Sequence, residues 1–95
     1  MYAVVRRYKD ATALFDELVR REQEVRGLIQ DVPGFMAYYL VRSGDGGATI
    51  TICQDQSGTA ESTRRAADWV RQNMPAAAGN PPEVTEGEVA INFGQ

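Results

Sequence analysis

The spacing of the apolar residues changes several times along this chain, and this change of period constrains the fold more than any other feature. Residues 2–8 are rich in β-branched and aromatic types, which is typical of a strand. Residues 11–30 carry apolar side chains at steps of three and four, which predicts an amphipathic helix. Pro33-Gly34 ends this helix, and the apolar segment 35–42 predicts a second strand.

The second half of the chain shows the same change of period. Residues 43–47 are Ser-Gly-Asp-Gly-Gly and favour a hairpin loop, because Gly and Asp accept the positive φ of such turns. Strict alternation over 48–54 predicts a third strand. Ser57–Thr59 offer N-cap hydroxyls to a second helix over 59–74. Residues 83–93 alternate again and predict a last strand.

The predicted order is therefore βαββαβ. This is the split βαβ arrangement, an α+β ferredoxin-like fold with a four-stranded antiparallel sheet and two helices on one face. Ninety-five residues suffice for one domain, so we expect residues 1–95 to form a single domain with a modest core.

The strands divide their side chains into an apolar set and a mixed set, because side chains alternate between the two faces of a strand. We expect the apolar set to lie under the two helices; it consists of Ala3, Val5, Ile50, Ile52, Val89, Ile91 and Phe93. The mixed set lies on the opposite face and consists of Tyr2, Val4, Arg6, Thr49, Thr51, Cys53, Ala90 and Asn92.

The second strand is apolar or aromatic on both faces. We assign Met36, Tyr38, Leu40 and Arg42 to the mixed face because this set is the more polar; a one-residue slip would reverse the assignment. Two helices cover only one face of a sheet, and a large apolar patch elsewhere is typical of an interface or a ligand groove. The sequence therefore predicts a homodimer in which a second copy covers the mixed face, with a semi-polar space between the sheets.

The order of elements resembles the antibiotic biosynthesis monooxygenase-like domains of the dimeric α+β barrel superfamily. Two segments carry the resemblance further: Pro33-Gly34-Phe35 before the second strand, and Ala66-Ala67-Asp68-Trp69-Val70 in the second helix. The superfamily includes cofactor-independent oxygenases and haem-degrading enzymes, so the resemblance implies a fold and a dimer more strongly than a reaction. The haem-degrading members bind iron through a histidine, and this sequence has none.

The composition excludes several classes of function. The net charge of −3 makes nucleic acid a poor partner, because affinity for phosphate comes mainly from Lys and Arg. No apolar stretch reaches the ~20 residues of a membrane span. The single cysteine, Cys53, cannot form an internal disulfide, fits a cytoplasmic protein and is expected to be a small buried apolar residue. Without His or a Cys-x-x-Cys motif, we expect no metal and no cofactor.

Five residues are candidates for lining a small-molecule site between the mixed sheet face and the helix layer: Arg6, Tyr38, Trp69, Asn73 and Asn92. Such a pocket needs apolar walls with a few oriented polar groups, and these residues supply the polar groups. Trp69 and Asn73 are one helical turn apart and look like the Trp and Asn of family active sites. The alternative for Trp69 is packing at the dimer interface.

Other side chains have competing interpretations. Arg6, Arg7 and Arg42 suit an anionic or quinone-like substrate through their forked donors, or they are solvated or paired with Glu86 and Glu88. Tyr38 and Tyr39 are adjacent and point to opposite faces, so we expect only one to line the cavity. Asp55 and Glu61 resemble a carboxylate pair, but their place near a helix N-terminus accounts for them without catalysis.

Two functions of different class remain. The first is a dimeric barrel that binds a small organic molecule between sheet and helices without catalysis. The second is a cofactor-independent, monooxygenase-like enzyme acting on an aromatic or polyketide-like substrate, in which the protein supplies desolvation and hydrogen bonds. The absence of histidine and of a clear base favours the first.

Overall fold

The fold was analysed in a computed structural model that describes residues 1–94. Four strands and four helices follow one another along the chain. Their bounds are β1 (Tyr2–Tyr8), α1 (Thr12–Arg20), α2 (Glu22–Ile29), β2 (Phe35–Ser43), β3 (Gly46–Cys53), α3 (Gln56–Asn73), α4 (Pro75–Ala78) and β4 (Glu83–Glu88).

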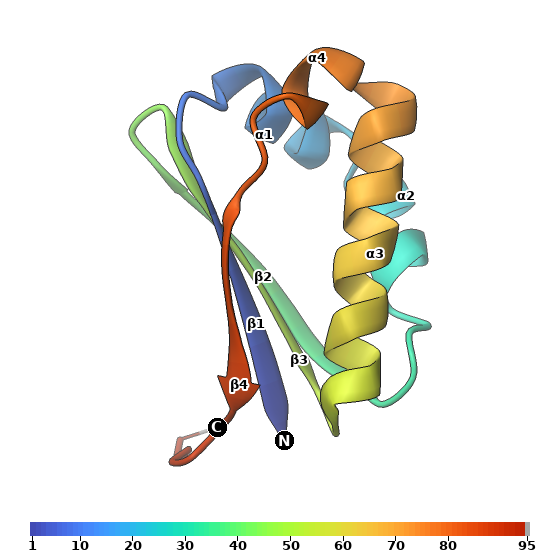
Figure 1. Cartoon of the computed structure of the whole chain (residues 1–95), viewed down its shortest axis with the longest axis vertical. Coiled ribbons are helices and arrows are strands. Elements are labelled where there is room, and N and C mark those ends of the chain that lie inside the picture. The colour runs from blue at the N-terminus through green and yellow to red at the C-terminus, as the bar shows by residue number, and fades with distance from the viewer. Residues whose placement is uncertain (95) are drawn as a thin grey trace.

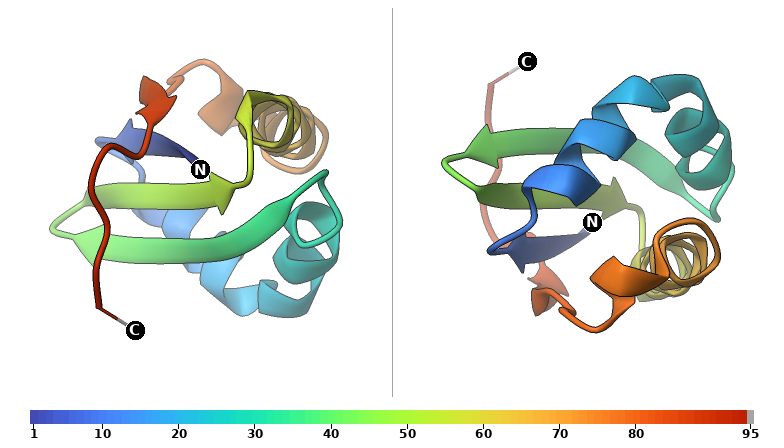
Figure 2. Two further views of the ribbon diagram at one scale, coloured as in Figure 1. Left: turned by 90° about the horizontal axis from the view of Figure 1, so that it is seen from below. Right: turned by 90° about the horizontal axis from the view of Figure 1, so that it is seen from above.

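The four strands form one antiparallel sheet in the order β2-β3-β1-β4. The helices α1, α2 and α3 all lie on one side of this sheet, and the other side is open (Figure 1). Seen along the long axis, α2 lies toward the β2 edge and α3 lies toward β1 (Figure 2). This is the ferredoxin-like α+β fold, so the predicted fold class is confirmed.

The first predicted helix is divided in two. Arg21 leaves the helical conformation, with φ −103° and ψ 38°, although neither Gly nor Pro stands there. The division lets both halves bury apolar residues: Leu14 and Phe15 in α1, and Val25 and Ile29 in α2. Packing against the sheet therefore overrides the continuous helical pattern of 11–30.

The helix α3 begins earlier than predicted. Its N-cap is Asp55, whose Oδ1 accepts from the Ser57 backbone N–H at 3.1 Å, so the cap precedes the Ser57–Thr59 segment. The first turn of α3 passes close to the end of β3 and to the loop before β2. A Cβ on Gly58 would lie 2.1 Å from the Pro33 carbonyl oxygen and 2.8 Å from the Cys53 Sγ. Only glycine permits this approach.

The last strand is shorter than predicted. The β1–β4 pairing stops where Tyr2 lies opposite Glu88, because β1 begins at Tyr2 and offers little partner beyond it. The prediction of a strand to residue 93 is therefore wrong after Glu88. Ile91 and Phe93 are 80% and 94% exposed and do not belong to the core.

The helices cover the face opposite to the one expected. Val4, Arg6, Thr49, Thr51 and Cys53 are buried beneath them, so the mixed set forms the covered face and the prediction was wrong. The reason is that α3 brings polar partners to the sheet, since Ser62 and Thr63 bind Arg6. The open face carries the apolar set instead, in cross-strand rows that include Ala3, Ile52 and Ala37; Val5, Ile50 and Tyr39; and Ala48 and Val41.

The assignment within the second strand agrees with the structure from Tyr38 onward, but not at Met36, because Phe35 takes the place on the mixed face at the start of the strand. Tyr38 lies opposite Thr51 and Leu40 lies opposite Thr49, so both belong to the mixed face. An irregularity between Phe35 and Ala37 then places Phe35 opposite Cys53. The side chain of Phe35 therefore also belongs to the mixed face, at the start of the edge strand β2.

Candidate functional site

A groove lies at the edge of the sheet between β2 and the helices α1 and α2. Its volume is about 500 Å³, in the range of pockets that hold small organic ligands. Apolar side chains dominate its walls, among them Leu18, Val25, Ile29, Phe35 and Leu40. The polar side chains that line it are Glu22, Arg26, Gln30, Tyr38 and Tyr39.

A smaller cavity lies deeper, between the sheet and the helices. Its volume is about 30 Å³, close to the space that one water molecule occupies in the liquid. Leu18, Val25, Ile29 and Tyr38 line both this inner cavity and the groove, so the two spaces share a wall. The other residues of the inner cavity are Arg6, Tyr8, Leu28, Thr49, Ala66, Trp69 and Val70.

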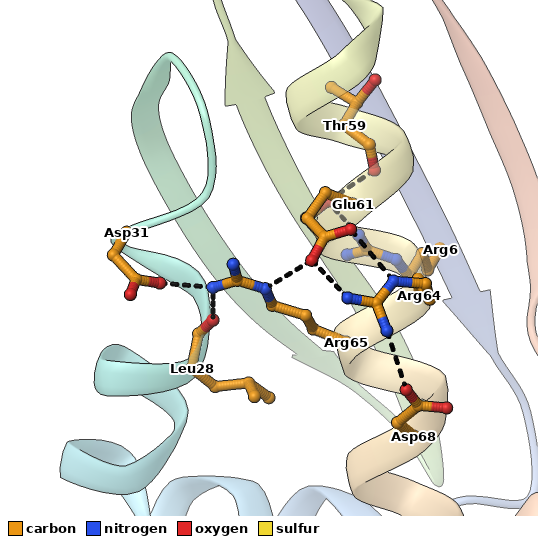
Figure 3. Close-up of polar contacts among 9 residues, drawn as sticks. Arg6, Leu28, Asp31, Thr59, Glu61, Arg64, Arg65 and Asp68 are labelled. Atoms are coloured by element: carbon orange, nitrogen blue, oxygen red, sulfur yellow. Dashed lines mark hydrogen bonds and ion pairs between the residues drawn. The ribbon is translucent and has the colours of Figure 1, made fainter.

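Arg6 is the polar centre of this region. It is 1% exposed, and hydroxyl groups from β3 and α3 accept all of its hydrogen bonds in the described structure. Its Nη1 donates to Thr49 and Thr51 at 3.2 Å each. Its Nη2 donates to Ser62 at 2.6 Å and to Thr63 at 3.0 Å, and its Nε donates to Thr63 at 3.2 Å. Figure 3 shows Arg6 behind α3, on the sheet side of the helix.

Within the described structure, Arg6 has no carboxylate in direct contact, and Glu86 acts on its charge only through space. Among residues 1–94, no Asp or Glu side chain lies within ion-pair distance of it. Each of the other eight arginines has such a partner: Arg7, Arg20, Arg21, Arg26, Arg42, Arg64, Arg65 and Arg71. The most deeply buried arginine is therefore the exception.

Burial sets the protonation of the groups around the inner cavity. It lowers the pKa of the Arg6 guanidinium, which nevertheless stays charged at neutral pH. Burial also raises the pKa of the Tyr8 phenol, and it raises the pKa of Tyr38 to about 12. Both phenols are consequently neutral hydrogen-bond donors at neutral pH.

Trp69 closes the inner cavity from the helix side. It is 6% exposed, and its Nε1 donates to the Glu24 Oε2 at 2.6 Å. The Arg21 guanidinium lies 5.6 Å from the ring centroid, within the range of a cation–π interaction. The ring is thereby held between α3 and α2 and lines the cavity.

The two asparagines lie outside both spaces. Asn73 is exposed; its Nδ2 donates to the Trp69 carbonyl at 2.9 Å, and its Oδ1 accepts from Arg21 at 3.0 Å. Asn73 therefore supports the position of Trp69 rather than facing the cavity. Asn92 is exposed in the segment after β4 and lines neither space. The structure thus brings together Arg6, Tyr38 and Trp69 of the five predicted residues.

The remaining candidates have other partners. Arg7 pairs with Glu83 at 3.4 Å and Arg42 pairs with Asp16 at 2.9 Å, so neither uses Glu86 or Glu88. Tyr38 lines both spaces, whereas Tyr39 is 57% exposed and lines only the groove. Of the two, only Tyr38 lines the cavity between the sheet and the helices, as expected, whereas the groove at the sheet edge is lined by both tyrosines.

The carboxylates near the start of α3 have structural partners. Asp55 caps the helix, as described above. Glu61 binds Arg64 at 2.5 Å and Arg65 at 2.8 Å, and these hydrogen bonds lower the pKa of Glu61 to about 2. Arg65 extends the network to Asp31 and to the Leu28 carbonyl, which ties α3 to the end of α2 (Figure 3). Neither carboxylate lines the groove or the inner cavity.

Sequence reasoning missed Tyr8, Thr49 and the apolar residues that α1 and α2 contribute to the two spaces. The sequence did contain a signal for a buried arginine, namely residues with side-chain hydroxyls on one strand and one helix. Thr49 and Thr51 on the strand and Ser62 and Thr63 on the helix are suited to surround a buried cation. Within residues 1–94, no cluster of His, Cys, Asp or Glu is arranged to hold a metal, and no helix there is long and apolar enough to cross a membrane.

Solved structures of other proteins have a similar fold. A protein from Bordetella bronchiseptica, named as a candidate antibiotic biosynthesis monooxygenase, is 14% identical with a TM-score of 0.70, over 95% of this chain and 97% of that one. The heme-degrader MhuD from Mycobacterium tuberculosis, solved with two hemes in its active site, is 16% identical with a TM-score of 0.64, over 99% and 100%. SnoaB from Streptomyces nogalater, a cofactor-independent oxygenase, is 18% identical with a TM-score of 0.60, over 99% and 97%.

The chain has the antibiotic biosynthesis monooxygenase-like fold. No family model matches the sequence, and no curated protein matches it. MhuD is a heme-degrader and SnoaB is a cofactor-independent oxygenase, so proteins with this fold catalyse different reactions. The fold alone therefore does not determine the activity of this chain.

The groove and the inner cavity lack the histidine and cysteine ligands that commonly hold heme iron. The sequence contains no histidine, and Cys53 lines neither the groove nor the inner cavity. Tyr8 and Tyr38 line the inner cavity, and burial raises the pKa of both phenols, which disfavours the tyrosinate form. The two spaces thus offer phenols to heme iron, but neither a histidine nor a cysteine.

Proposed function

We propose that this protein binds a small organic molecule in the groove between β2 and the helices α1 and α2, with one end reaching the inner cavity. The observation that carries the proposal is the shared wall: the same four side chains line both spaces. A ligand lying along that wall meets apolar surface in the groove and Arg6, Tyr38 and Trp69 at the inner end. This combination of apolar walls and few polar groups is typical of ligand sites.

A fluorescent neutral probe tests this proposal. N-phenyl-1-naphthylamine becomes fluorescent in apolar surroundings, so we expect saturable fluorescence on titration with the protein. Val19 lines the groove and is 51% exposed, so Val19→Trp fills space without disturbing the core. Val84 is similarly exposed, at 47%, and lies away from the groove, so Val84→Trp is the matched control. Equal binding by the two variants would remove the groove as the site.

We also propose that the protein is a homodimer in which a second copy covers the open face of the sheet. Support comes from the side chains of that face, where Val5, Ile50 and Ile52 are accompanied by Tyr39 and Val41. Tyr39 and Val41 are 57% and 52% exposed in the single chain. A contiguous apolar face of this kind is typical of a protein–protein interface.

A cofactor-independent oxygenase is the second candidate function. The observation that favours it is the cation Arg6 beside Tyr38 in an enclosed cavity, where it would stabilise a substrate anion that reacts with dioxygen. A balanced test reaction is the conversion of 1-naphthol and O₂ to 1,4-naphthoquinone and water, in which one oxygen atom enters the ring. Quinone formation above the uncatalysed rate, lost in Val19→Trp, would establish the activity; its absence would leave binding alone.

A further inference from the structure

We infer that the ligand is an organic anion, whose aromatic or apolar body lies in the groove and whose carboxylate or other oxyanion lies in the inner cavity against Arg6. This inference rests on the proposed ligand-binding function and names the chemical class of the ligand. Three independent features of the inner cavity support it: its charge, its donors and its size.

The first feature is the uncompensated charge of Arg6. An arginine that is 1% exposed has lost its hydration, and the hydroxyls that accept its hydrogen bonds carry no opposite charge. In every other arginine of the chain a carboxylate supplies that charge, even on the surface. A ligand anion would supply it at Arg6.

The second feature is the set of donors around the cavity. Tyr8 and Tyr38 line it as donors, Arg6 lines it as a charge whose N–H groups already donate to hydroxyls, and no Asp or Glu lines it in the described structure. The phenols keep their protons at neutral pH, as shown above, so they donate to an anion and do not repel it. Glu24, the carboxylate that binds the Trp69 Nε1, lines neither space. The cavity is therefore suited to an acceptor and unsuited to a cation.

The third feature is the size of the two spaces. The inner cavity, about 30 Å³, holds a group of the size of one water molecule, and the groove, about 500 Å³, holds the body of a small aromatic compound. The ligand class is thus a compound with a compact anionic head and an apolar body. Leu18, Val25 and Ile29 line both spaces, so they would contact the ligand where its head meets its body.

Two isosteric probes separate charge from shape. We would measure the binding of 2-naphthoate and of its neutral isostere 2-naphthamide by isothermal titration calorimetry at pH 7. Hydrogen bonds to a charged group are stronger than those to a neutral one, so we expect 2-naphthoate to bind at least about tenfold more tightly. The preference should persist in high salt, because a buried pair is screened much less than an exposed one.

Variants then test the role of Arg6. Arg6→Gln should abolish the preference for 2-naphthoate and leave the affinity for 2-naphthamide nearly unchanged. Arg7→Gln is the matched control, since Arg7 is the next residue, points to the open face and is exposed; it should keep the full preference. If circular dichroism shows that Arg6→Gln does not fold, Tyr38→Phe replaces it and should reduce the preference severalfold.

The outcomes separate the two proposals. Equal binding of both probes by the wild type would overturn the anion inference and leave the groove as a binding site. A preference that survives Arg6→Gln, or that Arg7→Gln abolishes, would also overturn it. If neither probe binds while N-phenyl-1-naphthylamine does, the anion inference alone fails; if all three fail to bind, the proposed function fails with it.

Discussion

The indole N–H of Trp69 donates to the Glu24 carboxylate at 2.6 Å, and this hydrogen bond joins α3 to α2 across 45 residues of sequence. The bond matters for the site because Trp69 lines the inner cavity from above the sheet. Asn73 adds a second connection, since it binds both the Trp69 carbonyl and Arg21. The position of the tryptophan ring is therefore fixed by two helices.

We predict that Trp69→Phe lowers the free energy of unfolding by about 1–3 kcal/mol, because it removes a hydrogen bond to a charged group and part of a buried ring. Glu24→Gln should cost less, since the Glu24 side chain is 49% exposed and water replaces part of the interaction. Urea denaturation of both variants measures the difference. A larger loss in Glu24→Gln than in Trp69→Phe would contradict this account of the contact.

Two helical glycines make a second, paired prediction. Gly58→Ala should be strongly destabilising, because the new Cβ would meet the Pro33 carbonyl at 2.1 Å, and backbone has to move. Gly27 lies in α2, where a new Cβ would meet nothing within 4 Å, so Gly27→Ala should stabilise the protein by about 0.5–1 kcal/mol. In thermal denaturation, the melting temperature should fall for Gly58→Ala and rise for Gly27→Ala. Similar shifts would show that α3 does not pack as closely as described.

Periodicity predicted the order of helices and strands along the chain and the division of strand side chains into two faces, because both depend on the local spacing of side chains. The alternation of Val4 and Arg6 with Ala3 and Val5 separated the faces correctly. Periodicity did not predict which face the helices cover. That choice depends on Ser62 and Thr63, whose hydroxyls reach Arg6 from a helix 56 and 57 residues away.

The same limit applies to the candidate site. Arg6, Tyr38 and Trp69 were proposed because their types suit a pocket, and alternation placed Arg6 and Tyr38 on the same face of the sheet. Asn73 was placed one helical turn from Trp69, but the turn directs its side chain to Arg21 and away from the cavity. Asn92 was assigned to a strand that ends at Glu88, opposite Tyr2, where β1 begins. Local pattern cannot show where a partner strand stops.

The open face of the sheet yields a prediction about assembly. Val41→Lys places a charge next to Tyr39 on the open face, at the end of the apolar set of β2, so it should shift the protein from dimer toward monomer. Val84→Lys is the control, because Val84 has nearly the same exposure and lies in the row of Arg6, on the other face. Light scattering after size exclusion measures the mass of each variant. A wild-type mass near 10.5 kDa would rule out the dimer at the concentration used.

The raised pKa of Tyr38 predicts how stability changes in alkali. A phenol whose pKa is about 12 in the folded protein, against a usual value of 10.0, holds its proton more tightly when folded than when unfolded. Its contribution to stability is therefore complete below about pH 10, and it is lost as the pH rises toward about pH 12. Burial is the main cause of the shift, so the effect should persist in salt.

Tyr38→Phe isolates this contribution, because phenylalanine keeps the ring and has no proton to lose. We expect the wild type to lose more unfolding free energy than Tyr38→Phe between about pH 9 and about pH 11, measured by urea denaturation at each pH. Tyr8, whose pKa burial also raises, is present in both proteins and cancels in the comparison. Equal losses in the two proteins would mean that the Tyr38 hydroxyl is solvated in the folded state. It would then offer the anion of a ligand no buried donor, and Arg6 would be left as the main source of any preference for charge.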